Sequence, residues 1–382
     1  MKTSVRPVVT AALVMILLGL ALQWQTVSDS PSPLSAPDIL AAESGGKKWF
    51  RGNLHTHSLW SDGDDYLETI AMWYRDHHYD FLVFTDHNTL ATNKDRWVDI
   101  SKKPTGREAY DRLRQRFPGD WVEDRTTGGK TEVRLKTYEE VVARVAVPDE
   151  FLLIQGEEVT DRFGRLPVHL CATNIKELIP PLHGESVSET ISNNVNALIA
   201  QRERTGQPMI IHLNHPNFGY GVTAEDLAAV RGEKFFEVYN GHPGVNNSGD
   251  SLHASTGRMW DIILTKRLAE LGLDVMYGLA TDDGHNYHQI PSRKSEPGRG
   301  WVSVLAKKLT PAALISSLER GDFYSSSGVR LERVISSREG LDVQVFADKG
   351  IAYRIDFIGT RAAYDPKSKP VLDAKGKAIN AT

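Results

Sequence analysis

The chain has 382 residues, of which 40% are hydrophobic and 25% are charged, and its formal net charge is −4 at pH 7. These are ordinary values for a globular protein with one large core, or with one main domain and smaller appendages. Lys and Arg form no long run, so the charge pattern does not indicate nucleic acid or an anionic membrane surface as a partner. The single cysteine, Cys171, excludes an intrachain disulfide and lies in an apolar run, where a small core residue is expected.

The N-terminal segment is basic and then apolar. Lys2 and Arg6 precede a fifteen-residue apolar stretch at residues 8–22, and a polar linker with several prolines follows, up to about residue 42. This pattern is typical of a secretion signal, which predicts export to the periplasm or the extracellular space. The stretch is shorter than the roughly 18 apolar residues that a membrane span needs. Because a clear cleavage site of small residues is missing, an uncleaved membrane anchor is the alternative.

Short apolar runs alternate with longer segments of helical spacing in the next part of the chain. The runs predict strands at residues 81–85, 151–155, 168–172, 209–213, 235–239 and 275–280. Helices are predicted at residues 189–206 and 256–272, and Gly272 is suited to end the second one. Uninterrupted apolar runs are typical of strands buried on both faces, as in a parallel sheet covered by helices. With a weaker first strand before His55, about seven β/α units result. We therefore expect a barrel-like α/β domain, with a doubly wound sheet as the alternative.

The main domain is expected at residues 43–328, and two segments differ from it in character. Residues 92–136 form a long polar insertion between the second and third strands, which either covers the site as a lid or is mobile without a role in it. Residues 329–382 begin with alternating polar and apolar side chains and end in a polar tail. Such alternation indicates half-buried antiparallel strands, so a small β-rich appendage is predicted there.

Residue types that bind metals follow nearly every predicted strand. In chain order they are His55 and His57, Asp86 and His87, Glu157 and Glu158, His169, His215, Asn240 and His242, and Asp282, Asp283 and His285. The carboxyl ends of parallel strands in an α/β barrel meet at one rim, where the functional sites of such barrels are built. One polar residue after one strand means little, but imidazoles and carboxylates after almost all of them predict a metal site at this rim.

Several spacings fit this chemistry. His55 and His57 lie two residues apart and share one face of an extended segment, and Asp283 and His285 repeat this spacing. Asp62 stands in a Ser-Asp-Gly turn that can return its carboxylate toward the histidines. Mixed nitrogen and oxygen ligands suit zinc, manganese or iron, whereas the lack of thiolates disfavours a structural zinc site.

Two pairs of neighbouring candidates stay open on the residues alone. Either Glu157 or Glu158 can supply the carboxylate that follows the third predicted strand. Likewise, either His212 or His215 can supply the imidazole near the end of the run at residues 209–213. A carboxylate such as that of Glu158 has two oxygens, which two cations can share.

Five motifs in a fixed order carry a resemblance to a known family. They are HTHSLWSDG, FLVFTDHN, GEEVT, NHPN and TDDGH, and together they resemble the polymerase-and-histidinol-phosphatase (PHP) superfamily of metal-dependent hydrolases. Four further segments, FLLIQGEEVTD, VHLCATN, MWDIIL and RGWVSVLAKKLTPAALISSLERGDFYSSSG, resemble its carbaryl-hydrolase-like branch. The resemblance covers about residues 48–330. It implies a distorted seven-stranded (β/α) barrel, the PHP type of TIM-like barrel, with two or three divalent metal ions at its C-terminal rim.

The resemblance also implies a role for each motif residue. His55 and His57 would bind a first cation with Glu158 and Asp283, Glu158 would bridge to a second cation held by His169 and His215, and Asp62, His87 and His285 would hold a third. The Gly-x-Glu pattern of the family favours Glu158 over Glu157, and its His-Pro pattern favours His215 over His212. Glu157 is therefore expected beside the ligands or at the surface, and His212 in the core or beside the ligands. Many family members have histidine where this chain has Asp62, which leaves the occupancy of the third site open.

Other polar residues near the rim are expected to support the site or bind substrate. Asp86 and Asp282 would orient neighbouring ligands, a common role for such carboxylates. Asn240 and His242 follow a predicted strand and are assigned to the same supporting or substrate-binding group. Arg162 follows the GEEVTD segment and would either bind an anionic substrate or lie exposed.

These residues predict a metal-dependent hydrolase, with three functions to consider. The first is a phosphoesterase, because most of the family cleaves phosphate esters with hydroxide that the cations generate near neutral pH. Asp283, as proton acceptor, and Glu158, as bridging ligand, are the expected catalytic residues. The second function is hydrolysis of a carboxylic or carbamate ester or an amide, as the carbaryl-hydrolase-like branch implies. The third is an exported metal-binding protein without activity. For the first two, the partner is a small-molecule substrate.

Overall fold

The computed structural model describes residues 46–337, 340–367 and 369–382. The predicted signal or anchor segment at residues 1–42 lies outside these ranges. Within the described ranges, no helix has the length and hydropathy that a membrane span requires. The chain divides into two compact units: residues 47–327 and 369–382 form one, and residues 328–367 belong to the other.

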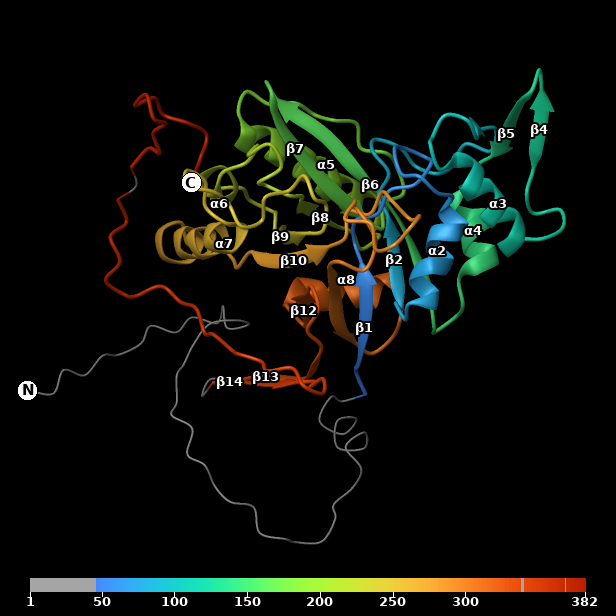
Figure 1. The fold of residues 1–382 in the computed structure, drawn as a ribbon. Helices are drawn as coiled ribbons and strands as arrows, with labels where there is room; N and C mark the ends of the chain where they lie inside the picture. The colour runs from blue at the N-terminus through green and yellow to red at the C-terminus, as the bar shows by residue number, and fades with distance from the viewer. Residues whose placement is uncertain (1–45, 338–339, 368) are drawn as a thin grey trace, which may run out of the picture. The chain divides into compact units, whose positions relative to one another are not determined.

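The larger unit is built around a sheet of nine strands (Figure 1). In sheet order they are β10 (Tyr277–Thr281), β9 (Phe235–Asn240), β8 (Ile210–Leu213), β7 (Leu166–Thr173), β6 (Leu152–Phe163), β2 (Phe81–Phe84), β1 (Lys48–Asn53), β11 (Trp301–Ala306) and β12 (Phe323–Ser326). The two outermost strands approach each other, because the Ser325 hydroxyl of β12 donates a hydrogen bond to the Gly278 carbonyl of β10 at 2.7 Å. The sheet is therefore a nearly closed barrel, which confirms the predicted α/β barrel and excludes the doubly wound alternative.

Seven of the nine strands run in the same direction, and β7 and β11 run against them. The pairs β1–β2, β2–β6, β8–β9 and β9–β10 are parallel, whereas β7 is antiparallel to both β6 and β8, and β11 to both β1 and β12. The sequence predicted that the strand at residues 168–172 is parallel to its neighbours. This direction is wrong, because β7 is antiparallel to both. Only Gly164 and Arg165 separate β6 from β7, too short a connection for a parallel crossover, so the two strands form a hairpin.

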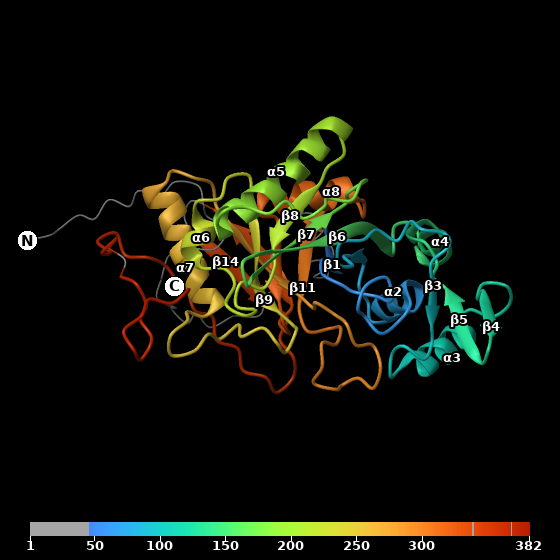
Figure 2. The same ribbon diagram turned by 90° about the horizontal axis from the view of Figure 1, so that it is seen from above.

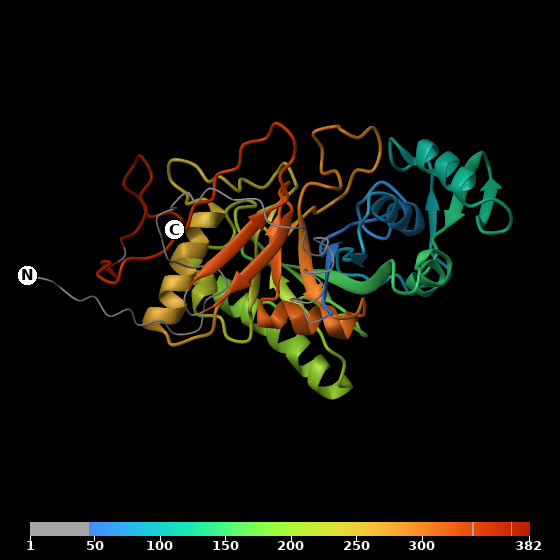
Figure 3. The same ribbon diagram turned by 90° about the horizontal axis from the view of Figure 1, so that it is seen from below.

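Helices lie outside the barrel in all three views (Figures 1, 2 and 3). They are α2 (Leu67–Asp76), α5 (Val187–Thr205), α6 (Ala224–Ala228), α7 (Thr256–Thr265) and α8 (Pro311–Arg320). Helix α5 is well delimited: the Ser186 side chain accepts a hydrogen bond from the Glu189 amide at its start, and Gly206 ends it in the left-handed conformation. Helix α7 continues as a π-helical turn over Lys266–Glu270, so the helix predicted at residues 256–272 is present with altered geometry at its end.

The predicted insertion is a folded unit at one side of the barrel (Figure 2). It contains α3 (Gly106–Arg116) and a three-stranded sheet of β3 (Trp97–Asp99), β5 (Lys130–Arg134) and β4 (Asp124–Thr127), and α4 (Tyr138–Val145) follows it. The Trp121 indole donates to the Glu68 carboxylate of α2 at 2.9 Å. Arg112 of α3 donates to the Tyr287 carbonyl in the β10–β11 loop, also at 2.9 Å. These contacts tie the insertion to the barrel beside its rim.

The C-terminal residues divide between the two units. The smaller unit contains an antiparallel hairpin of β13 (Leu331–Ser336) and β14 (Leu341–Val345), in agreement with the predicted small β appendage. Residues 369–382 instead belong with the barrel. Within that unit, Thr382 accepts a hydrogen bond from the Ala224 amide at 2.7 Å, and the Asn380 side chain donates to the Tyr220 carbonyl at 2.8 Å.

Candidate metal centre

The inward-facing side chains of the barrel change from apolar to polar toward the carboxyl ends of the strands. Ile154 of β6 and Phe235 of β9 belong to one buried apolar cluster. Side chains alternate along a strand, so Glu158 and Glu237, four and two residues further on, share the faces of those apolar residues. The apolar core of the barrel thus lies next to a polar layer at the rim where the sequence predicts the site.

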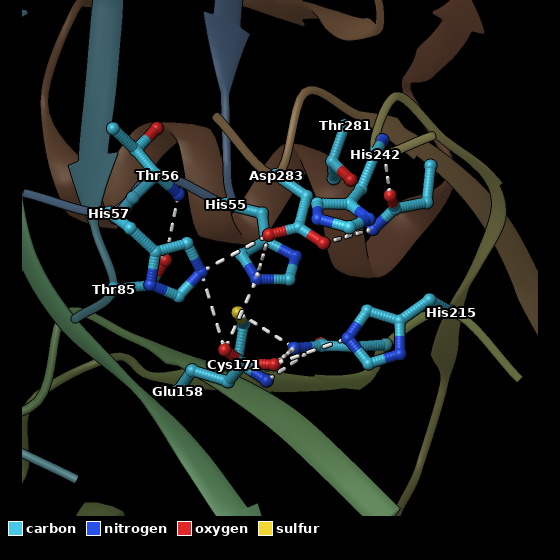
Figure 4. Close-up of polar contacts among 12 residues, drawn as sticks. His55, Thr56, His57, Thr85, Glu158, Cys171, His215, His242, Thr281 and Asp283 are labelled. Carbon is cyan, nitrogen blue, oxygen red and sulfur yellow. Dashed lines mark hydrogen bonds and ion pairs between the residues drawn. The ribbon is translucent and has the colours of Figure 1, made fainter. Parts of the chain in front are cut away.

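Six of the predicted ligands lie close together, five of them buried and His169 partly buried, and we call them the inner set: His55, His57, Glu158, His169, His215 and Asp283. Nε2 of His55 lies 3.3 Å from Oδ1 of Asp283 and 3.5 Å from Oε2 of Glu158. Nε2 of His57 lies 3.2 and 3.3 Å from the same two oxygens. Figure 4 shows these two imidazoles and two carboxylates directed toward one another.

The two carboxylate oxygens of Glu158 face different histidines. While Oε2 faces His55 and His57, Oε1 lies 3.1 Å from Nδ1 of His169 and 3.3 Å from Nε2 of His215. His169 reaches the rim because β7 runs against β6, so the start of β7 lies beside the end of β6. The side-chain amide of Asn214 donates to Oε1 at 2.8 Å and fixes the orientation of the carboxylate. A carboxylate held in this way can bind one cation through each oxygen.

The other three predicted ligands, Asp62, His87 and His285, are more open, and we call them the outer set. Oδ1 of Asp62 lies 3.6 Å from Nε2 of His87 and 3.3 Å from Nε2 of His285. The side chains of Asp62, His87 and His285 are 54%, 27% and 17% exposed, whereas no side chain of the inner set exceeds 13%. Lys103 of the insertion donates to the main-chain carbonyl of Asp62 at 2.6 Å, so the insertion borders the outer set.

The side chains fit divalent cations. Three groups have ligand atoms within 4.8 Å of one another and belong to the two sets: His57, Asp62, His87 and His285; His55, Glu158 and His215; and His55, His57 and Asp283. Within the described ranges, the buried Nε2 atoms of His55 and His57 have no hydrogen-bond partner, whereas Oε2 of Glu158 lies 2.7 Å from Nδ1 of His87. Leaving converging buried polar atoms unpaired is costly, and a shared cation would satisfy them.

The charges of the two sets are strongly coupled. Burial opposes ionisation of Glu158 and Asp283, but the surrounding imidazoles outweigh it and hold the pKa of both carboxyls well below the ordinary range. Burial, reinforced by His285, lowers the pKa of His57 to about 3. At His87 burial acts in the same direction, yet Glu158 and Asp62 prevail and raise its pKa to about 10. A cation binding at His87 therefore has to displace a proton.

Glu237 holds the inner set in place and was not found from the sequence. Its Oε1 lies 2.7 Å from Nδ1 of His55, which leaves Nε2 of that ring free to face the site. The Thr281 hydroxyl donates to Oε1 at 2.7 Å, and the His215 amide donates to Oε2 at 2.8 Å. Carboxylates that accept from the second nitrogen of a ligand histidine commonly fix its tautomer and orientation. A single buried carboxylate in the apolar run FFEVY was the available signal.

His212 and Asn240 both contact Glu237. Nε2 of His212 lies 3.4 Å from Oε1 of Glu237. Behind the inner set, His212 also belongs to a buried group with His55 and Cys171, in which burial raises the pKa of the thiol to about 12. The side-chain amide of Asn240 donates to Oε2 of Glu237 at 2.8 Å and to Oδ2 of Asp283 at 3.1 Å. The structure thus places both residues beside the predicted ligands.

Asp86 and Asp282 fix the loops that carry the ligands. Asp86 accepts from the amide and the hydroxyl of Ser58, both at 2.8 Å, and therefore holds the segment directly after His57. Asp282 accepts from the Tyr74 hydroxyl at 2.8 Å and from the amides of the β10–β11 loop, and burial raises its pKa to about 6.

Two candidates are not brought to the site. Glu157 points to the opposite face of β6, where its carboxylate accepts from the Ile179 amide at 2.6 Å and burial raises its pKa to about 8. It is neither beside the ligands nor at the surface, because neighbours on a strand face opposite sides. The face of β6 that carries Glu157 contacts the main chain of Ile175 and Ile179, and the Glu157 side chain is buried there. Arg162 is exposed in the β6–β7 hairpin. Of its two alternatives, substrate binding and an exposed position, the structure agrees with the second.

The backbone is strained at two of the predicted ligands. His215 and Asp283 have φ values of +23° and +49°, a region that residues with a Cβ rarely adopt. Each such position costs roughly 1–3 kcal/mol and persists where surrounding contacts impose it, often at functional sites. Here the contacts of Glu237 with the His215 amide and of Asn240 with the Asp283 carboxylate supply that constraint.

Comparison with known proteins gives no close relative. No family model and no curated protein matches the chain. Among solved structures, a two-domain protein from Bacteroides vulgatus containing a predicted PHP-like metal-dependent phosphoesterase is similar, with 17% identity and a TM-score of 0.42 over 78% of this chain and 76% of that one. A second, a candidate metal-dependent phosphoesterase from Bifidobacterium adolescentis, has 13% identity and a TM-score of 0.34 over 71% of this chain and 96% of that one. The assignment of a function therefore depends on the site itself.

Proposed function

We propose that the protein is a metal-dependent hydrolase that acts as a phosphoesterase with two or three divalent cations of zinc, manganese or iron. The main support is the position of Glu158 between two groups of histidines, one at each of its oxygens. Such a carboxylate is suited to a polynuclear centre, and the ligand motifs resemble those of the PHP superfamily, most of which cleaves phosphate esters.

The residues of this chain have separate tasks in the proposed reaction. His55, His57, Glu158, His169, His215 and Asp283 would hold two cations, and Asp62, His87 and His285 a third. When bound, such cations lower the pKa of water and polarise an ester oxygen. Oδ2 of Asp283 is bonded to Asn240, so Oδ1 faces the site, and the low pKa of the carboxyl keeps it ionised, as a cation ligand and proton acceptor would have to be.

Hydrolysis of a carboxylic or carbamate ester is the second candidate, and one observation favours it. Phe218 lies beside His215, and His242 lies next to Phe218, so the described ring contacts at this part of the rim are aromatic, while Arg162 is exposed in the hairpin. A neutral ester needs no cationic side chain for binding, whereas a phosphate monoester carries a double negative charge that the metal ions alone would have to balance.

Metal analysis and a substrate panel test this proposal. We expect purified protein to contain two or three equivalents of divalent metal and to hydrolyse p-nitrophenyl phosphate or its bis-ester faster than p-nitrophenyl acetate. Glu158→Ala and His57→Ala should lose both metal and turnover, whereas Glu150→Ala, at an exposed glutamate, should lose neither. Preference for the acetate would favour the second candidate. Metal without turnover on any substrate would favour a binding protein.

We also propose that residues 1–42 direct export or anchor the chain at a membrane. Fractionation of cells that express the full chain should place it outside the cytoplasm or in the membrane fraction. Deletion of residues 1–42 should retain it in the cytoplasm, and an unchanged distribution would contradict the proposal.

A further inference from the structure

The loops after β8 and β9 form one wall beside the inner set. Phe218 and Val245 pair as an isolated antiparallel bridge between the two loops. The Asn217 side chain reinforces this pairing by donating to the carbonyls of Asn246 at 2.9 Å and Ala254 at 3.0 Å. The two loops are therefore held together before any ligand binds, as a preorganised surface requires.

Phe218 presents an aromatic ring next to two of the predicted ligands. Its ring centre lies 5.1 Å from that of His215 and 6.3 Å from that of His169, and its side chain is half-buried. It also meets the His242 ring edge to face, at 6.2 Å and 87°. A flat apolar surface thus adjoins the part of the centre assigned to the second cation.

The hydrogen bonds of His242 determine which of its ring nitrogens carries a proton. The Gly244 amide donates to Nδ1 at 2.9 Å, so in the neutral ring the proton is on Nε2. Within the described part of the chain, Nδ1 is the ring nitrogen of His242 that forms a hydrogen bond and Nε2 forms none, and none of the possible metal-binding groups includes His242. Its Nε2–H is therefore a donor that the fold does not use.

The position of His242 relative to Asp283 is fixed through Asn240. Oδ1 of Asn240 accepts from the His242 amide at 2.8 Å, while its amide group donates to Oδ2 of Asp283 at 3.1 Å. The His242 ring centre lies 5.5 Å from that of His285, and Figure 4 shows the residue beside Asp283. A Cβ at Gly244 would lie 3.0 Å from two atoms of the His242 ring, so only glycine fits there without displacing the imidazole.

We propose that His242 and Phe218 form the substrate pocket of this centre. His242 donates a hydrogen bond from Nε2 to a non-bridging oxygen of the scissile ester group, and Phe218 contacts a flat, apolar leaving group. The inference rests on the proposed hydrolase function and narrows its substrate class to aryl or similarly planar esters. Neither residue is a metal ligand, so both act on substrate affinity and not on metal content.

Binding of two phosphonates to the metal-loaded protein tests the pocket without turnover. Phenylphosphonate and methylphosphonate have the same charged group, and only the first has a ring to contact Phe218. By calorimetry, the wild-type protein should bind phenylphosphonate about threefold to tenfold more tightly, the range of a single aromatic contact. Phe218→Ala should remove this preference and leave methylphosphonate binding unchanged.

His242 variants test the proposed hydrogen bond. His242→Ala should weaken the binding of both phosphonates about tenfold or more, as expected for loss of a hydrogen bond to a charged group. His242→Gln, whose amide nitrogen reaches the position of Nε2, should recover part of the affinity, whereas His242→Asn should not. His77→Ala, at an exposed histidine at the end of α2, is the matched control and should bind both probes like wild type.

The outcomes separate this inference from the proposed function. Loss of metal from His242→Ala would overturn the inference, because the residue would then belong to the metal centre. Wild-type affinity in His242→Ala, a phenyl preference that survives Phe218→Ala, or no binding of either phosphonate by the wild type would overturn it as well. If the wild type binds phosphonates as expected but hydrolyses no ester, the pocket stands and the hydrolase proposal fails.

Discussion

The inner and outer sets bring similar residue types together in different surroundings. Each inner carboxylate and His55 have a supporting residue of their own: Glu237 for His55, Asn214 for Glu158 and Asn240 for Asp283. In the outer set, the Asp62 carboxylate is more than half exposed, and among the described residues its side chain has only a weak bond from Ser61, at 3.4 Å, besides its histidine contacts. Buried and supported ligands lose little freedom on binding, so we expect tight cation binding at the inner set and exchangeable binding at the outer set.

The largest effect should follow from Glu158→Gln. The amide keeps the size of the side chain but cannot be shared by two cations, so metal binding at the inner set should fail. Loss of such a preorganised electrostatic group should reduce turnover about a thousandfold. Metal analysis and steady-state kinetics measure the two losses, and full metal content in this variant would contradict the bridging role.

Glu237→Gln tests whether support, and not ligand identity alone, distinguishes the inner set. Removal of such a supporting carboxylate should weaken metal affinity about tenfold to a hundredfold while every ligand stays in place. Glu233→Gln is a suitable control, because Glu233 is also buried but bonds to the amides of Lys234 and Phe235. Competition with a metal chelator measures the affinity, and equal results for the two variants would remove the proposed role of Glu237.

Asp62→Asn should separate the two sets. The variant should lose the outer cation and keep those of the inner set, because Asp62 bonds to the outer histidines and only at 3.7 Å to His57. We expect turnover to fall about tenfold, which corresponds to roughly 1.4 kcal/mol in the barrier. Native mass spectrometry counts the bound cations. Simultaneous loss of all of them would mean that the two sets are one cooperative unit.

The last effect concerns the outer set alone and depends on pH. Below its pKa of about 10, His87 carries a proton that must leave before a cation can bind the ring. Metal affinity at the outer set should therefore fall as the pH is lowered, by up to about tenfold per pH unit for each proton released. Chelator competition between about pH 8 and about pH 6 measures this slope. His87→Gln, which has no such proton to release, should show a shallower slope.

The sequence predicted the fold class, and most of the residues that the structure gathers at the rim could be named from it, because two simple patterns coincide. His87, His215 and Asp283 were found since each follows an apolar run, and parallel strands bring their carboxyl ends to one rim. The residues alone left Glu157 and Glu158 open, and only the family's Gly-x-Glu pattern favoured Glu158. The register of β6, which decides the face of each side chain, is not visible in one sequence. The same limit applies to strand direction, because an apolar run such as VHLCA looks alike in parallel and antiparallel strands.

Glu237 and the insertion show a second limit. One carboxylate among four apolar residues in FFEVY does not disturb a strand prediction, so its partners His55 and Thr281 could be found only in three dimensions. The strands of the insertion are short and polar, and β4 is exposed along its whole length. Residues 92–136 have no regular spacing of apolar side chains, so the sequence predicted a loop there. In the structure, strand pairing and a contact with α2 hold this segment in place.

The β6–β7 hairpin has a consequence for the order in which the protein assembles. Glu158 and His169 are only eleven residues apart in the chain, yet they are two of the three ligands assigned to the second cation. Closing so short a loop costs little entropy, so we expect it early in folding, whereas His215 joins only when β8 pairs with β7. We therefore expect a partial cation site to form before the barrel closes, and metal bound there during synthesis would favour the native pairing of β8.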